Sequence, residues 1–200
     1  MFIQGPAGNI EAQWDQTPDA INTAVLCHPH PLFGGSMHDG VLQLASLVFN
    51  QCGINCFRFN FRGVGGSEGA HDKGVGEIED LNTVVSWLAN ERPKQKPWLV
   101  GYSFGANVVW QGLKRYRAAQ LGGVLLIAPP VGRMSFSEFE SLPCPVFAVA
   151  GDRDDYVDTD AFLAWAQVNT SIISGADHFF SGRSEALTLA LRSVLEDYAD

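Results

Sequence analysis

The sequence predicts an α/β fold with a mostly parallel central sheet, helices on both of its faces and an antiparallel hairpin at the N-terminus. Short apolar runs of strand character alternate with segments of helical apolar spacing from residue 21 to the end of the chain. The 200 residues are 46% hydrophobic and 18% charged, which is the composition of an ordinary globular protein. No internal repeat, low-complexity tract or linker interrupts the alternation, so we expect one domain over residues 1–200.

The first elements are a hairpin, a buried strand and a helix. Residues 2–5 (FIQG) and 10–14 (IEAQW) are short β-type runs around the turn residues PAGN. Residues 21–28 (INTAVLCH) form a continuous apolar run that ends at a proline-rich loop, which is typical of a buried parallel strand. Residues 41–53 have helical apolar spacing and end at a glycine, where helices commonly stop.

The middle of the chain repeats this order. Residues 54–61 (INCFRFNF) predict a strand that leads into the glycine-rich RGVGGSEG. Residues 76–93 predict an amphipathic helix with acids at its start and an Arg-Pro stop. A strand at 97–102 (PWLVGY) is followed directly by a helical pattern at 104–117.

The last third supplies two more buried strands, at 122–130 and 145–155. A helix at 159–168, a strand at 170–174 and a closing helix at 184–199 complete the alternation. The longest insertion between elements, residues 130–144, is too short to form a cap domain over the sheet.

Charge and hydropathy exclude several classes of protein. The net charge of −9 argues against binding to nucleic acid or to an anionic membrane surface, because both require basic patches. No apolar run approaches the roughly 18 residues of a membrane span. The N-terminus lacks the basic and apolar regions of a signal peptide.

The four cysteines, Cys27, Cys52, Cys56 and Cys144, form no C-x-x-C pair. Three of them lie in or beside apolar strand-like runs. We therefore expect small buried hydrophobic residues in a reducing cytoplasm, with no disulfide or zinc framework.

Two segments match G-x-S-x-G, the pattern of a serine nucleophile on a tight strand-to-helix turn. Ser103 in GYSFG follows a predicted strand and precedes a helical pattern, as that chemistry requires. Gly101 and Gly105 suit the close approach of strand and helix, and the Phe104 N–H at the helix N-terminus is the natural first oxyanion donor.

Ser67 in GGSEG fails the same tests. It lies in a loop, no helix follows it, and Glu68 would place a negative charge beside any oxyanion. The same loop lacks the G-x-G-x-x-G spacing of a dinucleotide site, and no phosphate-binding G-x-x-x-x-G-K-[ST] is present, so we expect no cofactor.

A serine nucleophile needs a base and a carboxylate, and along such a fold the chain order is serine, then Asp or Glu, then histidine. His178 is the one histidine after Ser103, and it lies in the loop GADHFF between the last predicted strand and helix. The acid is expected directly after the apolar run PVFAVAG (residues 145–151), where Asp154 is favoured and Asp152 and Asp155 are alternatives. Spacing alone does not choose among these acids.

The loop HPHPLFGGSMH after the first parallel strand is expected to supply the second oxyanion donor. Pro29 and Pro31 have no N–H, so the Leu32 amide is favoured and Phe33 is the alternative. His28 and His30 form an H-x-H pair, but no further ligand pattern accompanies them. We expect them to hydrogen-bond within the loop and to hold no metal.

The chain resembles the α/β-hydrolase superfamily along nearly its whole length. The segments CHPHPLFGGSMHDG, FNFRGVGGSEG, VGYSFGA, AGDRDDYVD and GADHFF carry the resemblance, in the family's order. In that family the acid usually ends a G-x-x-D, here Gly151 to Asp154, and the histidine matches His178. The most similar members are small lidless esterases and acyl hydrolases near the dienelactone-hydrolase-like branch, with serine in place of cysteine. The oxyanion loop departs from the usual H-G run, which leaves the second donor open.

The resemblance implies hydrolysis of a small-molecule carboxylic ester by a Ser103–Asp154–His178 triad, with Phe104 and Leu32 as oxyanion donors. A thioesterase or peptidase would use the same triad. A non-catalytic binding protein on this fold is a further alternative, and the presence of all three residues, Ser103, Asp154 and His178, argues against it. The absence of a cap predicts an open, shallow site that accepts short or exposed acyl groups.

Overall fold

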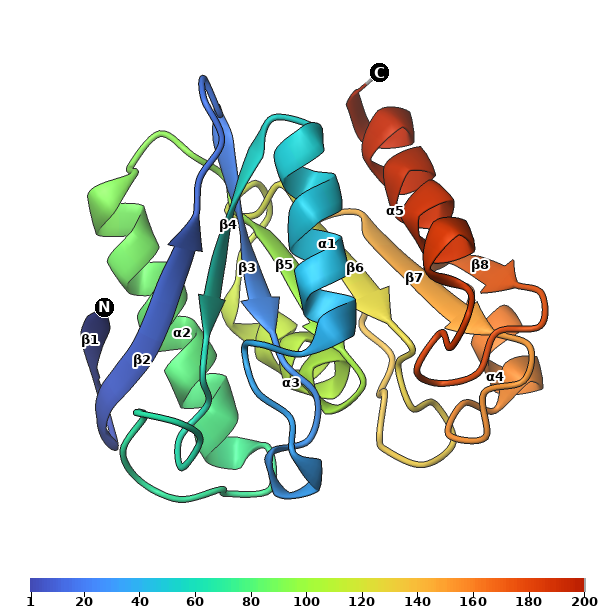
Figure 1. The fold of residues 1–200 in the computed structure, drawn as a ribbon, viewed down its shortest axis with the longest axis horizontal. Coiled ribbons are helices and arrows are strands. Elements are labelled where there is room, and N and C mark those ends of the chain that lie inside the picture. Colours follow the sequence, from blue (N-terminus) through green and yellow to red (C-terminus); the bar gives the residue numbers. More distant parts are fainter. Residues whose placement is uncertain (200) are drawn as a thin grey trace.

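Eight strands form one sheet in this computed structural model, which describes residues 1–199. In chain order they are β1 (Phe2–Gly5), β2 (Gly8–Asp15), β3 (Asn22–Cys27), β4 (Ile54–Phe59), β5 (Trp98–Tyr102), β6 (Gly123–Ile127), β7 (Val146–Gly151) and β8 (Asn169–Ile173). Their spatial order is β1-β2-β4-β3-β5-β6-β7-β8 (Figure 1). β1 pairs antiparallel with β2, and β2 pairs antiparallel with β4. All the other neighbours are parallel, so the expected hairpin and parallel sheet are confirmed.

Helices cover both faces of the sheet. They are α1 (Gly40–Gln51), α2 (Val75–Glu91), α3 (Phe104–Gly112), α4 (Thr159–Leu163) and α5 (Ser184–Ala199), with 3-10 turns at Pro31–Phe33 and Leu113–Arg115. α1 and α5 contact each other on one face, and α2 and α3 contact each other on the other (Figure 1). The short α4 lies beside β8 at one edge of the sheet.

Two apolar layers result from the alternation of side chains along the strands. On β3, Val25 and Cys27 belong to the layer under α2 and α3, whereas Ala24 and Leu26 belong to the layer under α1 and α5. All four residues are fully buried. This burial on both faces explains why the strand is an unbroken apolar run instead of an alternating one.

Two helices are shorter than the sequence pattern predicts. The helix expected at 104–117 ends at Gly112, because Tyr116 adopts an extended backbone and its hydroxyl donates to Asn82 Oδ1 on α2, at 2.8 Å. The helix expected at 159–168 ends at Leu163. The Trp165 ring lies 4.5 Å from the ring of Trp110, so a tertiary contact replaces the expected helical structure of residues 164–168.

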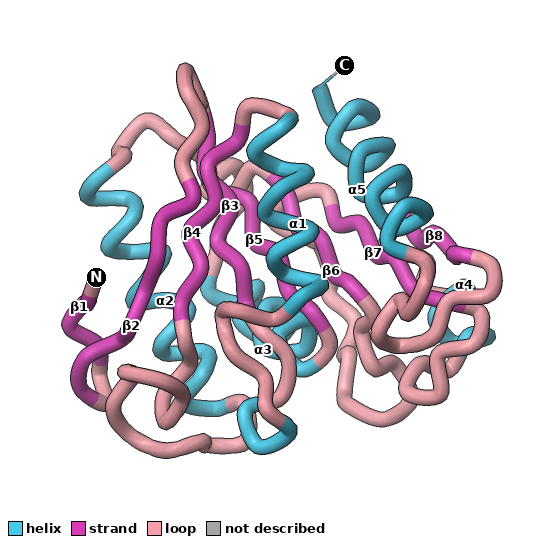
Figure 2. The backbone as a smooth tube through the Cα atoms, viewed as in Figure 1, coloured by secondary structure: helices cyan, strands magenta, loops and turns pink. Residues whose placement is uncertain are grey.

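The loops that follow the parallel strands gather at one edge of the sheet, at the bottom of Figures 1 and 2. The segments after β3, β5, β7 and β8 carry His28, Ser103, Asp154 and His178 respectively. The carboxyl edge of a parallel sheet is where ligands usually bind in such folds.

His28 ties the end of β3 to the end of β4. Its ring is fully buried, Nδ1–H donates to the Pro29 carbonyl at 2.7 Å, and Nε2 accepts from the Phe61 N–H at 3.0 Å. Nδ1 therefore bonds within the loop, as expected from the sequence, whereas Nε2 bonds the segment after β4. Burial lowers the pKa of His28 to about 4, so the ring is neutral at physiological pH.

Ser67 joins two strands at a buried position. Its hydroxyl donates to the Asn60 carbonyl at 2.7 Å and accepts from the Glu11 N–H at 2.9 Å. The neighbouring Glu68 carboxylate accepts from the Asn9 N–H at 2.6 Å. The second G-x-S-x-G segment thus links β2 to the loop after β4. Its serine hydroxyl donates its one proton to a backbone carbonyl and faces no histidine base.

Replacing Ser67 with Ala is expected to destabilise the protein by about 1–3 kcal/mol, because the Glu11 N–H and the Asn60 carbonyl both lose a buried partner. The measurement is the free energy of unfolding in urea. Ser36→Ala, at a half-buried loop serine of the same size, is the control and should change stability less. Equal stability of wild type and Ser67→Ala would show that these two hydrogen bonds do not stabilise the fold.

The free energy of unfolding is expected to fall as the pH drops from about 6.5 to 4. In this window the unfolded chain protonates His28, with an ordinary pKa of about 6.5, while the folded protein does not. The neutral state of His28 therefore contributes its full stabilisation above about pH 6.5, and this stabilisation is lost as the pH falls to about 4. The total loss in the free energy of unfolding is on the order of 3 kcal/mol. Urea unfolding of wild type and His28→Gln across this range measures it. The variant should show a shallower slope with pH, and identical slopes would refute the assignment.

Candidate active site

Ser103 lies on a sharp turn between β5 and α3. Its backbone has φ 54° and ψ −116°, in the region that non-glycine residues rarely adopt. The Ser103 N–H donates to the Ile127 carbonyl of β6 at 2.9 Å, which holds the turn. A Cβ at Gly101 would lie 2.6 Å from the Ala106 backbone, and one at Gly105 would overlap the Cys27 carbonyl. Both glycines are therefore required by the close approach of strand and helix, as the motif predicts.

Three side chains from three loops meet at this turn. The Ser103 Oγ lies 2.8 Å from His178 Nε2. On the other side of the ring, His178 Nδ1 lies 2.8 Å from Asp154 Oδ2 and 3.0 Å from Oδ1. His178 and Asp154 are both buried, and Ser103 is half-buried. In the neutral imidazole, Nδ1–H donates to the carboxylate and Nε2 accepts from the serine hydroxyl.

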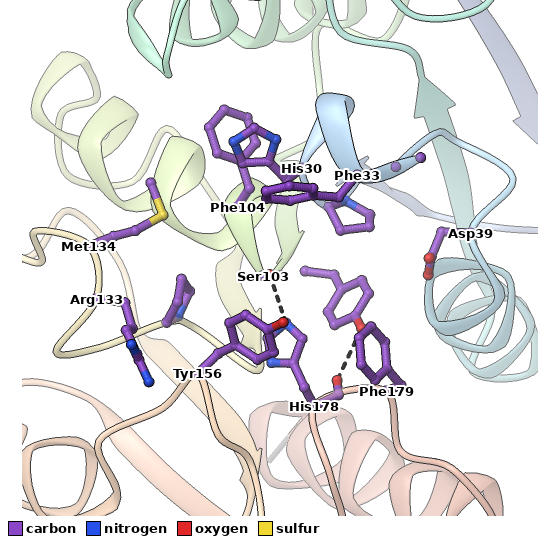
Figure 3. Close-up of a pocket in the computed structure, with 15 residues that line it drawn as sticks. His30, Phe33, Asp39, Ser103, Phe104, Arg133, Met134, Tyr156, His178 and Phe179 are labelled. Carbon is purple, nitrogen blue, oxygen red and sulfur yellow. Dashed lines mark hydrogen bonds between the residues drawn. The ribbon is translucent and has the colours of Figure 1, made fainter.

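Surrounding contacts fix the orientation of the histidine. The Tyr102 hydroxyl donates to the His178 carbonyl at 3.0 Å, and the Tyr156 N–H donates to Asp154 Oδ1 at 2.8 Å. The His178 ring lies 4.5 Å from the ring of Tyr156 and 5.4 Å from that of Phe179 (Figure 3). These rings leave the imidazole little room to turn away from Ser103.

The neighbouring acids have other partners. Asp152 accepts from the Gly175 N–H at 2.6 Å and from the Ser174 hydroxyl at 3.2 Å, on the loop after β8. Asp158 caps α4 by accepting from the Ala161 N–H at 3.0 Å. Asp155 is exposed. Of the acids that the sequence left open, the structure brings Asp154 to His178 and keeps Asp152 and Asp155 away from it.

The oxyanion loop differs from the expectation. The Leu32 N–H donates to His30 Nδ1 at 3.2 Å, and the Phe33 N–H donates to the His30 carbonyl at 3.0 Å. Both amides are therefore occupied within the 3-10 turn that the Pro31 ring begins. The structure does not bring Leu32, which is 71% exposed, to the Ser103 pocket. The reason is that the turn folds back on His30 instead of opening toward Ser103.

Phe104 and His30 are pocket-lining residues whose backbone N–H groups are free in the structure. Among residues 1–199, neither the Phe104 N–H nor the His30 N–H has a hydrogen-bond partner, and both residues line the pocket. Phe104 begins α3, whose first N–H groups have no intrahelical acceptor. His30 was not among the donors expected from the sequence. The sequence does contain a signal for it, because His30 lies between Pro29 and Pro31 and carries the one backbone N–H of that tripeptide.

Aromatic contacts hold His30 against the nucleophile turn. Its ring lies 4.9 Å from that of Phe104 and 4.7 Å from that of Phe33 (Figure 3). It also lies 4.8 Å from the ring of His71. Burial lowers the pKa of His30, which favours the neutral ring that accepts the Leu32 N–H. The loop after β3 and the start of α3 are thus packed directly against each other.

The pocket around Ser103 encloses about 330 Å³ and has mainly aromatic walls. Its lining residues are Pro29, His30, Phe33, Gly34, Gly35, Asp39, Tyr102, Ser103, Phe104, Pro130, Arg133, Met134, Tyr156, His178 and Phe179. Within residues 1–199, no group of three or more His, Cys, Asp and Glu side chains is arranged to hold a metal ion. No helix in the described part of the chain has the length and apolar character to cross a membrane.

Comparison with known proteins identifies the family. The sequence profile of the family described as serine aminopeptidase, S33, matches residues 22–149, which include Ser103 but end before Asp154 and His178. An uncharacterised protein of Rickettsia prowazekii (strain Madrid E), RP471, is 34% identical over 98% of this chain and 87% of its own length.

Solved structures show the same relationship over the whole chain. XC6422 from Xanthomonas campestris, described as an α/β serine hydrolase without a lid, superposes with a TM-score of 0.90 and 33% identity, covering 99% of this chain and 93% of that one. An α/β serine hydrolase homologue from Coxiella burnetii superposes with a TM-score of 0.88 and 35% identity, covering 98% and 96%. The chain belongs to the α/β-hydrolase superfamily, in its compact branch of serine hydrolases that have no lid.

Proposed function

We propose that this protein is a serine carboxylesterase that cleaves small-molecule esters through an acyl-enzyme on Ser103. The observation that supports this most strongly is the continuous chain of contacts from the Ser103 Oγ through His178 to Asp154, with 2.8 Å at each step. Such a chain gives a serine hydroxyl both a base to accept its proton and a carboxylate to orient that base.

In the first half of the reaction, the Ser103 Oγ attacks the ester carbonyl while its proton passes to His178 Nε2. The carbonyl oxygen becomes an oxyanion in the tetrahedral intermediate. The imidazolium is stabilised by the Asp154 carboxylate, which faces Nδ1 with both of its oxygens. When the C–O bond breaks, the Nε2 proton goes to the leaving alkoxide, which departs as the alcohol.

In the second half, a water molecule takes the place of the alcohol. His178 Nε2 accepts its proton, the hydroxide attacks the acyl carbonyl, and a second tetrahedral intermediate forms. Its collapse returns the proton to the Ser103 Oγ and releases the carboxylic acid. The half-buried position of Ser103 gives water access to the acyl group.

The oxyanion would be stabilised by two backbone amides, Phe104 and His30. Both are free donors at the Ser103 pocket, and the Phe104 N–H also has the positive end of the α3 dipole behind it. One such donor is worth about 10²–10³ in rate in enzymes of this chemistry. This proposal replaces Leu32 with His30 as the second donor.

The protein is proposed to work in the cytoplasm on a small-molecule ester, without a cofactor. All four cysteines are free, and Cys27 and Cys56 are buried, which suits a reducing compartment. The aromatic walls and the small volume of the pocket suit a substrate with a short or compact acyl group.

Ser103→Ala is expected to abolish covalent labelling by a fluorophosphonate and to lower the hydrolysis of p-nitrophenyl butyrate by roughly 10⁴–10⁶-fold, because the nucleophile is lost. Mass spectrometry of the labelled protein and initial rates measure the two effects. Ser67→Ala is the matched control and should still label, because that hydroxyl is engaged between Glu11 and Asn60.

Labelling of Ser103→Ala would refute the proposed nucleophile. A panel of a p-nitrophenyl ester, an acyl thioester and an amino-acid p-nitroanilide distinguishes the reaction class. The largest kcat/KM is expected for the ester, and a larger value for the anilide would make the protein a peptidase that uses the same triad.

His30→Pro is expected to lower kcat about 10²–10³-fold relative to His30→Ala. Both variants lose the imidazole ring, but only proline loses the backbone N–H. The His30 backbone, with φ −60° and ψ 121°, already suits a proline followed by Pro31. Steady-state kinetics with p-nitrophenyl butyrate measure the difference, and circular dichroism checks the fold. Equal kcat values for the two folded variants would remove His30 from the oxyanion hole.

A further inference from the structure

Arg133 is the one lysine or arginine among the residues that line the Ser103 pocket in the described chain. It lies in the loop after β6, on the side of the pocket formed by Met134 and Tyr156 (Figure 3). The proposed reaction does not use it, since the triad and the two oxyanion donors are complete without it.

The backbone presents Arg133 on a tightly held turn. The Arg133 and Met134 N–H groups both donate to the Pro130 carbonyl, at 3.1 and 2.9 Å. The Asp158 N–H donates to the Val131 carbonyl at 2.8 Å, which anchors the turn to the start of α4. Gly132 has φ 87°, and a Cβ there would lie 2.7 Å from the Asp158 side chain, so the turn requires a glycine.

The guanidinium is positioned but its charge is not neutralised by an ion pair. One terminal nitrogen donates to the Asp155 carbonyl at 2.9 Å. Among residues 1–196, whose side chains the structure describes, no carboxylate lies within 4.0 Å of Arg133, whereas Arg58 and Arg62 each bind an aspartate. The side chain is exposed, so its remaining N–H groups are open to a ligand.

The opposite side of the pocket carries the opposite charge. Asp39 lines the pocket and caps α1, where its Oδ1 accepts from the Val41 N–H at 2.8 Å. Figure 3 shows Arg133 and Asp39 on opposite sides, with Ser103 and His178 between them. A ligand with a negative group is therefore attracted to one end of the pocket and repelled from the other, which fixes its direction across Ser103.

We propose that Arg133 binds a carboxylate of the substrate, and that the preferred substrates are esters that carry a second, anionic group, such as half-esters of dicarboxylic acids. This rests on the proposed esterase function. A guanidinium binds a carboxylate through two parallel N–H···O bonds, which gives direction as well as affinity. The anionic group is not changed in the reaction. It places the ester carbonyl between the Ser103 Oγ and the oxyanion donors.

The test compares matched anionic and neutral esters. The acyl pair is the p-nitrophenyl half-ester of glutaric acid and p-nitrophenyl pentanoate. The alcohol pair is the butyrate ester of 4-hydroxybenzoate and that of 4-hydroxybenzamide. Wild type is expected to have a kcat/KM about 10–100-fold higher for the anionic member of at least one pair, after subtraction of the uncatalysed rate. A preference for the neutral member of both pairs would overturn the proposal.

Arg133→Met keeps the length of the side chain and removes its charge. The preference for the anionic ester should disappear, while kcat/KM for the neutral ester stays within about 3-fold of wild type. Arg133→Lys should keep part of the preference, because it keeps the charge but not the two-pronged geometry. Arg117→Met, at an arginine outside this pocket, is the control and should keep all of it. Equal losses for neutral and anionic esters in Arg133→Met would show a structural role and refute the proposal.

A binding experiment separates this inference from the proposed function. Ser103→Ala cannot form an acyl-enzyme, yet its pocket keeps Arg133. Free glutarate, titrated by calorimetry, should bind Ser103→Ala about 10-fold more tightly than it binds the Ser103→Ala/Arg133→Met double variant. If glutarate binds in this way but no ester is cleaved by wild type, the esterase proposal fails and the carboxylate site stands. Equal affinities would overturn the carboxylate site, whatever the esters show.

Discussion

The close approach of β3, β5 and α3 at Gly105 is the constraint on which the whole site depends. At this point the helix backbone lies against the Cys27 carbonyl, directly before His28 and the oxyanion loop. One contact therefore sets the positions of two groups: the Phe104 N–H at the start of α3 and the loop that carries His30. The positive φ of Ser103 follows from the same geometry, because the chain must reverse within one residue to run from β5 into α3. The fold is strained here so that the serine stands at the edge of the sheet.

The sheet and two residues of the proposed triad, Ser103 and His178, could be predicted from simple signals in the sequence. Buried parallel strands are unbroken apolar runs, and Ser103 is recognised by the strand before it and the helix after it. His178 followed from chain order, since no other histidine comes after the serine. Asp154 was harder, because four aspartates stand within seven residues and capping and turn formation use the same side chain. Only the three-dimensional structure shows which of them faces the histidine.

Two differences from the sequence-based expectations share one physical cause, which is that contacts distant in sequence decide local structure. α4 ends early because Trp165 packs on Trp110 of α3, and no pattern within residues 159–168 encodes that contact. Leu32 was favoured because it is the first residue with an N–H after Pro31. Its amide instead bonds the His30 ring, and that ring is held by Phe104 and His71 from two other segments. Which acceptor an N–H binds within a 3-10 turn depends on such neighbours, so the sequence could not exclude Leu32 as an oxyanion donor.

A hydrolase without a lid must select its substrate with the few side chains that rim an open pocket. Here the apolar side chains at the rim are themselves exposed, with Phe33 at 87% and Phe179 at 63% exposure. An apolar group of a substrate is therefore only partly buried there, and it gains only part of the free energy that full burial would give. Solvent also screens charges at the rim, which makes a single exposed ion pair worth little. In the binding mode proposed for Arg133, two features would raise the contribution of such an ion pair: a planar guanidinium that can make two parallel bonds, and an opposing carboxylate at Asp39 that makes the reversed orientation unfavourable. Under that proposal, selection comes from orientation across Ser103 more than from enclosure.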